Sequence, residues 1–414
     1  MRSRSKRWLI LPILFSVAVV AGGLVPLSAL RDAVSGDIPG GMQLVLPRAY
    51  VLLSPVSRLL DALGLLSIGQ YVAVALTNIA VALLVAGLAR SHRRAPRVVA
   101  TVAASSGILV AAYACAAFLP RPMAMLSVSD PNTVRVDFHS HTSFSHDARR
   151  GFTPEENRAW HRAAGFDVAY ISDHNSFTGA EAAERRNPAR AGEGTVLLSA
   201  FEGRYRLTFE IFLSLTRVDS VALMDWRRWL SEGTLRSGRL PASVVALPSP
   251  LNDVQAVARD SAPHIVAIEI VDGSPRGYTQ QDREGGTIIR RADSLGLALV
   301  VGSNDHGWGR VAPGWTLVSA PGWRALAPDS LGAVIENTIR TSPRTAVQAV
   351  ERRRPSGVGL ALGFTVPVAL AQLFRALTLP DRLVWLVWIW GASLMWYGVR
   401  RGGQSSVVSN ARTL

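Results

Sequence analysis

The chain has 414 residues, a formal net charge of +14 and a hydrophobic fraction of 49%. Its apolar residues crowd the two ends, which is not the pattern of a single soluble domain, and the length allows two or three domains. Lys6 is the only lysine, and arginines beside apolar segments supply much of the charge, so the charge does not indicate nucleic-acid binding. The single cysteine, Cys115, excludes an intrachain disulfide.

Residues 1–126 are interpreted as a membrane region with about three spans. The apolar stretches long enough to cross a bilayer are 8–30, 71–89 and 98–119. A cleaved signal peptide is the alternative for the first stretch, and we favour a signal anchor because the stretch is long and other spans follow. Residues 43–68 predict an interfacial helix or a fourth span, in which Arg58 and Asp61 could pair on one face.

Residues 127–350 alternate short β-branched strands with helices rich in Ala, Arg and Glu, which predicts an α/β domain with parallel strands. Thr153 and Pro154 are a helix start, and we expect that helix to run to about Ala164 and stop at Gly165. The strands are expected from Val134 onward and at 168–171, 196–200, 244–247, 265–270 and 297–301.

The last region, residues 351–414, contains two further apolar segments, 358–373 and 383–397. A Pro-Asp-Arg turn at 380–382 separates them, so we predict a membrane hairpin followed by a polar tail. The four tryptophans of the second segment are typical of the membrane interface.

Polar side chains recur where the predicted strands end. The first strand runs through His139 to His141, two residues apart, so both side chains point to the same side of an extended chain, with Asp147 close behind. Such a group is a candidate metal site. The ends of three later strands carry His174, Glu202 and the run Asn304-Asp305-His306. In barrel-like α/β folds, the carboxyl ends of the strands form the active-site face.

Taken in order, these segments resemble the motifs of the polymerase-and-histidinol-phosphatase (PHP) superfamily of metal-dependent phosphoesterases. The resemblance covers roughly residues 133–310 and rests on Asp137–Thr142, Ser145–Asp147, Gly165–Asn175, Leu198–Gly203 and Gly302–Gly307. It implies a distorted (β/α)7 barrel, flanked here by N- and C-terminal transmembrane helices. It also implies one metal held by His139, His141 and Glu202, and another held by Asp147, His174 and His306.

The chain departs from the family pattern at three places. Histidines that the family supplies are missing from the segment 208–213 and at Leu247, and both losses fall on the same metal. The resemblance therefore implies two well-held metals and a middle one that is weakly held or absent, with Glu210 as a loosely aligned substitute. The third departure is Asn304, where Asp is usual, with Asp305 as the candidate replacement ligand.

We therefore expect a membrane-anchored phosphoesterase that hydrolyses a phosphate ester with a metal-activated water and uses about two ions of Zn²⁺, Mn²⁺ or Fe²⁺. Because the domain has no lysine, arginine must hold the phosphate, and Arg204, Arg276 and Arg310 are the candidates. His146 is a candidate acid. The alternative is a PHP-like module with little turnover that binds metal or a phosphorylated ligand as a sensor or assembly component. A polymerase-associated exonuclease is disfavoured by the tether between membrane spans.

Two side chains near these motifs are given supporting parts. Glu269, at a strand end, is expected to support a ligand rather than to bind metal. His161, within the helix after Thr153, is expected at the surface. The sequence identifies neither the class of the phosphorylated substrate nor an oligomeric state.

The expected location is a bacterial inner membrane, crossed several times. The basic N-terminus and the loop Arg90–Arg97 both favour the cytoplasm, which places the α/β domain outside if three spans precede it. The clusters Arg352–Arg354 and Arg400-Arg401 favour the opposite arrangement. We adopt the extracytoplasmic side because the loop Arg90–Arg97 is short and strongly basic.

Overall fold

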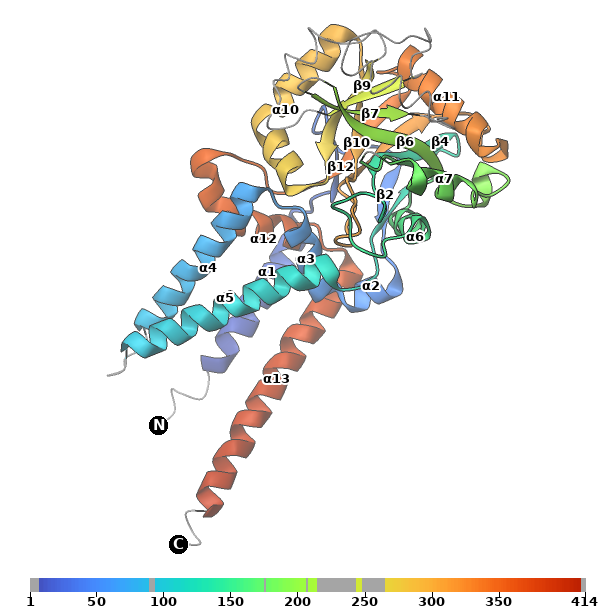
Figure 1. Ribbon diagram of the computed structural model, residues 1–414. Coiled ribbons are helices and arrows are strands. Elements are labelled where there is room, and N and C mark those ends of the chain that lie inside the picture. Colours follow the sequence, from blue (N-terminus) through green and yellow to red (C-terminus); the bar gives the residue numbers. More distant parts are fainter. Residues whose placement is uncertain are drawn as a thin grey trace.

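The structure is a computed structural model that describes residues 7–88, 94–174, 176–205, 208–213, 243–247 and 265–410. It combines a mixed α/β part, built on one large sheet, with a group of helices that extend from one side of it (Figure 1).

Ten strands form the large sheet, in the order β1-β12-β11-β4-β5-β6-β7-β8-β9-β10. Their bounds in chain order are Leu30–Asp32, Thr133–Ser140, Val168–Ile171, Val196–Tyr205, Thr208–Leu213, Ser243–Leu247, Ile265–Asp272, Ala298–Gly302, Gly314–Ser319 and Val347–Arg352 for β1 and β4 to β12. β4, β5 and β6 are parallel, as are β8, β9 and β10, and β7 runs antiparallel to both β6 and β8. Both parallel groups therefore present their carboxyl ends at the same edge.

The sheet curls so that its last strand returns to its middle. The His141 N–H donates to the Asp305 carbonyl at 2.9 Å, and the Asn304 N–H donates to the His139 carbonyl at 2.8 Å. Ser140 and Asp305 also form a parallel bridge. These contacts join the ends of β4 and β10, which are distant in strand order, and bring the first and last polar segments together.

The distorted (β/α)7 barrel expected from the resemblance is not shown. Only two residues separate Tyr205 of β6 from Thr208 of β7, which is too short for the crossover that parallel pairing requires, so β7 turns back as an antiparallel strand. On the other side, β11, β12 and β1 extend the sheet as an antiparallel arm.

Helices cover the sheet on both sides (Figure 1). They are α6 (Pro154–Ala164), α7 (Thr178–Glu184), α10 (Pro275–Leu295) and α11 (Pro328–Thr341), with short 3₁₀ turns at Ala191–Glu193 and Trp323–Ala325. Alternate residues of β4, Val134, Val136 and Phe138, are buried in an apolar core that includes residues of α11. The residues that alternate with them, Arg135, Asp137 and His139, point to the opposite face, as strand geometry requires.

The expected helix start at Thr153 is confirmed. The Thr153 side chain accepts a hydrogen bond from the Glu156 N–H at 3.2 Å, Pro154 is the first helical residue, and Gly165 ends α6 at φ 84°.

The long helices agree only in part with the expected membrane segments. α4 (Ile68–Leu88) and α5 (Arg94–Phe118) contain the two helical segments long and apolar enough to cross a membrane. The 3₁₀ turn Gly359–Phe364 with α12 (Thr365–Arg375) is bent by 117° from the segment Leu379–Val399 of α13, and this pair counts as a third segment only if taken together. The end helix α13 (Leu379–Asn410) extends far from the sheet (Figure 1).

The expected span over residues 8–30 is wrong in its length. A 3₁₀ turn at Arg7–Leu9 leads into α1 (Ile10–Leu24), whose 15 residues rise about 22 Å against a hydrocarbon core of about 30 Å. The chain leaves the helix before Pro26 and enters β1 at Leu30. The N-terminal region thus contributes a strand to the large sheet.

The expected interfacial helix over 43–68 is likewise wrong. This segment holds β2 (Met42–Val45), which pairs with β3 (Met125–Val128), and the helices α2 (Arg48–Leu52) and α3 (Ser54–Gly64).

Arg58 and Asp61 bind other partners instead of pairing. Arg58 contacts Asp381 at 2.5 Å, and Asp61 contacts Arg121 at 3.0 Å and Arg352 at 2.9 Å. All five side chains are buried, and we call them the junction cluster because they join α3 to β12, to α13 and to the segment after α5.

Candidate metal centre

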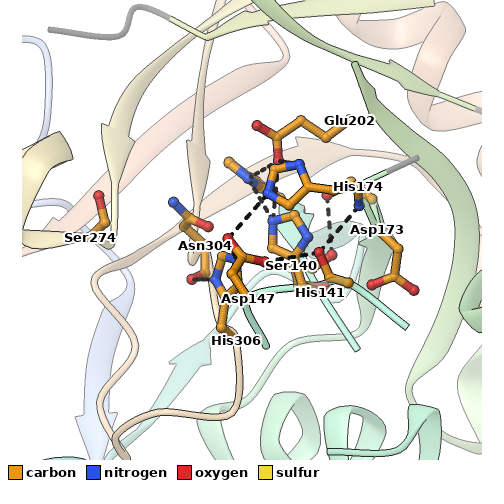
Figure 2. A network of polar contacts seen from close by, with 12 residues as sticks. Ser140, His141, Asp147, Asp173, His174, Glu202, Ser274, Asn304 and His306 are labelled. Atoms are coloured by element: carbon orange, nitrogen blue, oxygen red, sulfur yellow. Dashed lines mark hydrogen bonds and ion pairs between the residues drawn. The ribbon is translucent and has the colours of Figure 1, made fainter. Parts of the chain in front are cut away.

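The polar residues of the strand ends gather at the shared carboxyl edge of the sheet. His139 lies near the end of β4, His174 follows β5, Glu202 lies in β6, and His306 follows β10. Parallel neighbours place the first three side by side, and the curl of the sheet adds the last. Figure 2 shows the imidazoles of His141, His174 and His306 converging beside Glu202 and Asp147.

The deep end of the site holds three ligand atoms at close range. His139 Nε2 lies 3.0 Å from His141 Nε2 and 3.2 Å from Glu202 Oε2, and the last two atoms are 3.3 Å apart. Two ligands bound about 2.1 Å from a tetrahedral ion are themselves about 3.4 Å apart. The three atoms therefore lie at nearly the separations that one ion imposes.

A second group lies on the open side. Single ligand atoms of His141, His174 and His306 fall within 4.8 Å of one another. Asp147 Oδ2 lies 3.5 Å from His174 Nε2 and 3.3 Å from His306 Nε2. The structure thus brings together Asp147, His174 and His306, as expected, but it adds His141 to them. Glu202 Oε2 lies 3.4 Å from His174 Nδ1 as well, so Glu202 touches both groups.

Exposure rises steadily from one group to the other. The exposed fractions of the side chains are 0% for His141, 8% for Glu202, 17% for His174 and 44% for Asp147. Among these described side chains, those of Asp147 and His174 form the more open side of the site.

The donor set fits divalent cations. Among the described residues, His141 Nδ1 is buried without a hydrogen-bond partner, and His141 Nε2 converges on a second imidazole and a carboxylate. Burial, with His306 nearby, lowers the pKa of His141 to about 3, which keeps its ring neutral as a metal ligand must be. The mixture of imidazole and carboxylate ligands suits Zn²⁺, Mn²⁺ or Fe²⁺.

Carboxylates fix the charge of the deep group. Burial opposes the protonation of His139, but Glu269 and Glu202 outweigh it and raise the pKa of His139 well above its ordinary value. Burial likewise opposes the ionisation of Glu202, yet His139 and His141 hold the pKa of Glu202 well below its usual range. Burial raises the pKa of Glu269 to about 8. The pocket thus places a positive charge beside the ionised Glu202 carboxylate, where a metal ion would supply the same neutralisation.

Glu269 lies where a supporting residue is needed. Its Oε1 is 3.1 Å from His139 Nδ1, the ring nitrogen that faces away from His141. This contact orients the ring so that Nε2 points at the other ligands, a common arrangement behind metal-binding histidines.

The expectation that His161 is a surface residue is wrong. His161 is fully buried, and its Nε2 lies 2.7 Å from Asp137 Oδ2 while its Nδ1 contacts the Asn157 carbonyl at 2.9 Å. Asp137 Oδ1 also accepts from the backbone N–H groups of His139 and Ser303. The helical spacing could have revealed this role, since positions 157, 160, 161 and 164 form one face of α6 and all four are buried.

Asn304 and Asp305 differ in what they face. Asn304 has a φ of +48°, unusual for a residue other than glycine, and its side-chain nitrogen donates to Asp272 at 3.0 Å while its oxygen is buried without a partner. Figure 2 shows Asn304 beside the imidazole cluster. Asp305 Oδ1 accepts from the Gly307 N–H, and neither group of ligand atoms includes this carboxyl. The structure therefore does not bring Asp305 to the site as the expected replacement ligand.

Leu247, which stands where the family pattern has a histidine, belongs to the apolar core. Leu247 is 5% exposed and lies in the same apolar core as Val134 and Val136. Its register partner is Phe209 in β7. The side chain of Glu210, the possible substitute, lies outside the described residues.

The arginine candidates and His146 are less closely tied to the ligands. Arg276 is exposed in the first turn of α10, and Arg310 is half-buried with its Nε donating to the Arg121 carbonyl at 3.3 Å. The side chain of Arg204 lies outside the described residues. The exposed His146 ring is 5.2 Å from that of His174, so His146 borders the open side of the site.

No protein-family model and no curated protein sequence matches this chain. Three solved structures resemble it at low identity. PsfC from Pseudomonas syringae is 16% identical over 57% of this chain and 96% of its own, with a TM-score of 0.35. A two-domain protein from Bacteroides vulgatus, described as containing a predicted PHP-like metal-dependent phosphoesterase, is 16% identical over 53% of this chain, with a TM-score of 0.32; the chain spans 65% of that protein.

The third is an amidohydrolase from Chromobacterium violaceum with bound sulfate and no metal. It is 13% identical over 48% of this chain and 96% of its own, with a TM-score of 0.31. Similarity at this level does not assign a reaction to the chain. The chemistry of the site follows from the chain's own side chains.

Proposed function

We propose that the chain is a membrane-attached, metal-dependent phosphoesterase with its site at the carboxyl edge of the curled sheet. The observation that carries this proposal is the pair of adjoining ligand groups that share His141 and are both touched by Glu202. Two divalent ions held this way would supply a water of low pKa and positive charge for the attacking and leaving oxygens of a phosphate ester.

The ligand residues form a buried set and a more exposed set. His139, with Glu269 behind it, and Glu202 would hold a metal at the deep, buried position. Asp147, His174 and His306 would hold one at the open position, where a phosphate can enter. His146, beside His174, is placed to exchange a proton with a leaving group at the open side. Among the described residues, Arg276 and Arg150, which lies three residues after Asp147, are exposed arginines that could meet the phosphate.

The test uses the full chain purified in detergent. We expect about two divalent ions per chain and metal-dependent hydrolysis of p-nitrophenyl phosphate. The His139→Ala variant is expected to lose more than about 100-fold in kcat/KM because it removes a ligand. The matched control is Asp329→Asn, which changes an exposed carboxylate on α11. Bound metal without turnover of any phosphoester would reject the enzyme.

The second candidate function is a module that binds metal or a phosphorylated ligand with little turnover. Leu247 in the apolar core and Asn304 beside the imidazoles favour it, since both stand where the family pattern has ligands. Wild-type binding of inorganic phosphate in a metal-dependent manner, without hydrolysis, would support this alternative.

We also propose that residues 127–350 form a unit held between two membrane regions, on the extracytoplasmic side. Two helical segments of membrane-spanning length support the attachment. Of the basic loop Arg90–Arg97, residues 90–93 lie outside the described residues. A reporter that is active only in the cytoplasm, fused after Leu119, is expected to be silent, and its activity would place the unit inside.

A further inference from the structure

The loop that carries His306 is docked on the end of a helix of membrane-spanning length. The Gly309 N–H donates to the Ala117 carbonyl at 2.8 Å, and the rings of Trp308 and Phe118 meet edge to face at 5.3 Å. Ala117 and Phe118 are the last residues of α5. The open ligand group and the end of α5 are therefore parts of one packed unit.

The end of α5 marks a level along the membrane normal. The apolar segment Ala95–Phe118 has no fully buried residue in its spanning window, so much of its surface faces the surroundings. A helix of this kind ends where the hydrocarbon core gives way to the headgroups. Trp308 lies two positions after His306, a backbone span of about 7 Å at most. His306 therefore lies close to the level of the lipid headgroups.

The mouth of the site is bordered by exposed aromatic side chains. Trp308 is 46% exposed, Phe118 is 64% exposed, and Phe144, three residues before Asp147, is 44% exposed. Exposed aromatic rings of this size are typical of membrane–water interfaces, where the ring contacts acyl chains near the headgroups. The side of the site that is open to solvent is thus the side that carries apolar surface.

The two loops at the mouth are also joined to each other and carry positive charge. The Arg149 N–H donates to the His306 carbonyl at 2.8 Å, which links the loop of Asp147 to the loop of His306. Arg150 is exposed, and Arg149 beside it is 41% exposed and paired with Glu156 at 3.0 Å, so Arg150 carries the positive charge offered to a phosphate. Arginines at headgroup level attract lipid phosphates.

We propose that the site acts on a phosphate monoester carried by a lipid, with the phosphate entering past Asp147 and the apolar tail remaining in the bilayer beside α5. This inference rests on the proposed phosphoesterase function and adds the class of substrate. In the reaction, the oxygen of water bonds to phosphorus and the bond from phosphorus to the lipid oxygen breaks. One water proton passes to that oxygen, so the products are inorganic phosphate and a lipid alcohol.

The test compares three substrates on the full chain in mixed micelles of phosphatidylcholine and detergent. Phosphatidic acid presents the phosphate on a lipid, glycerol 3-phosphate presents it without a tail, and p-nitrophenyl phosphate reports hydrolysis in general. We expect kcat/KM for phosphatidic acid to exceed that for glycerol 3-phosphate by more than about 100-fold, and the rate to fall as phosphatidic acid is diluted within the micelle surface. Equal kcat/KM for the two would overturn the proposal.

Variants of the mouth provide an independent check. Trp308→Ala is expected to lower the ratio of kcat/KM for phosphatidic acid to that for p-nitrophenyl phosphate by about tenfold, through KM, and Trp308→Phe to restore most of it. The control Leu295→Ala changes an exposed apolar residue at the end of α10 and should leave the ratio unchanged. Loss of both activities in equal proportion in Trp308→Ala would overturn the inference. Hydrolysis of p-nitrophenyl phosphate alone would contradict the lipid substrate and leave the phosphoesterase standing, whereas no hydrolysis of any substrate would reject the phosphoesterase itself.

Discussion

At the scale of single residues, the deep end of the site depends on one imidazole held from both sides. His139 contacts Glu269 through Nδ1 and His141 and Glu202 through Nε2. Because the ring has only two nitrogens, loss of the contact to Glu269 frees the ring to rotate. The geometry of the deep ligand group is then no longer fixed before metal binds.

Replacing Glu269 tests this orientation. Glu269→Ala is expected to lower the affinity for the metal at the deep position by about 10–100-fold, as is usual when a partner behind a metal-binding histidine is removed. Glu269→Gln keeps a hydrogen-bonding group at the same place and should lose less. Competition with a chromogenic chelator measures both affinities, and an unchanged affinity in Glu269→Ala would show that His139 needs no such support.

Asp137 is a second residue that binds several partners at once. It is fully buried and accepts hydrogen bonds from two backbone N–H groups and from His161. Asp137→Ala leaves these donors without a partner, and each buried orphan costs about 1–3 kcal/mol. We expect a loss of at least about 3 kcal/mol in the free energy of unfolding, measured by denaturant titration in detergent. Asp329→Ala, at an exposed position, should lose less than about 1 kcal/mol; similar losses would argue against the buried role of Asp137.

At the scale of elements, α6 is the helix that holds the first strand end in place. Its Asn157 donates to the His141 carbonyl at 2.8 Å, and its His161 contacts Asp137. The position of α6 is fixed at its start by Thr153 and at its end by Gly165, whose added Cβ would lie 2.7 Å from the Leu126 carbonyl oxygen.

The cap of α6 gives a stability prediction. Thr153→Ala removes the side-chain oxygen that accepts from the Glu156 N–H and should lower the free energy of unfolding by about 1 kcal/mol. Thr153→Ser keeps that oxygen and serves as the matched control. Thermal unfolding followed by circular dichroism measures both, and equal melting temperatures for Thr153→Ala and the wild type would show that the cap does not stabilise the helix.

The sequence predicts some elements of this fold and not others for physical reasons. β5 and β10 are short runs of buried apolar residues followed by polar ones, and that contrast is visible along the chain. β1 is Leu30-Arg31-Asp32, three residues without periodicity, and it becomes a strand only because β12 lies beside it. The direction of β7 depends on the two-residue connection before it, and apolar content alone carries no direction.

The candidate site, too, can be predicted from the sequence only in part. The motif spacing places His139, His141, His174, Glu202 and His306, because each lies within four residues of the carboxyl end of a strand. The spacing does not show which of two neighbours points inward, and Asn304 rather than Asp305 lies beside the imidazoles because the backbone there takes a left-handed turn. The sharing of His141 between two groups depends on the curl of the sheet, a long-range property.

At the scale of the whole molecule, the junction cluster connects the helices to the sheet. Asp61 on α3 binds Arg121, just after α5, and Arg352, at the end of β12. Arg58 binds Asp381 at the start of α13. The exposed fractions of these side chains are all 7% or less, so water screens these ion pairs little.

Removal of the central carboxylate should therefore be costly. Asp61→Ala leaves two buried guanidinium groups without their counter-charge and is expected to lose about 3–5 kcal/mol in the free energy of unfolding. Asp37→Ala, at an exposed position in the same N-terminal part, is the control. Denaturant titration in detergent measures both variants. A loss below about 1 kcal/mol for Asp61→Ala would mean that the helices and the sheet are held together by apolar packing alone.

The junction cluster also has a consequence for the order in which the protein is made. Asp61 precedes Arg352 by 291 positions and Arg58 precedes Asp381 by 323, so the N-terminal carboxylate and guanidinium emerge long before these partners. At roughly 5–20 residues per second, Asp61 waits on the order of 15–60 s for Arg352. Arg121, 60 positions after Asp61, emerges earlier and can pair with it, but the remaining buried ion pairs of α3 form only after Arg352 and Asp381 have emerged. The docking of the sheet against the helices is thus a late event in biogenesis, completed only after Arg352 and Asp381 have been synthesised.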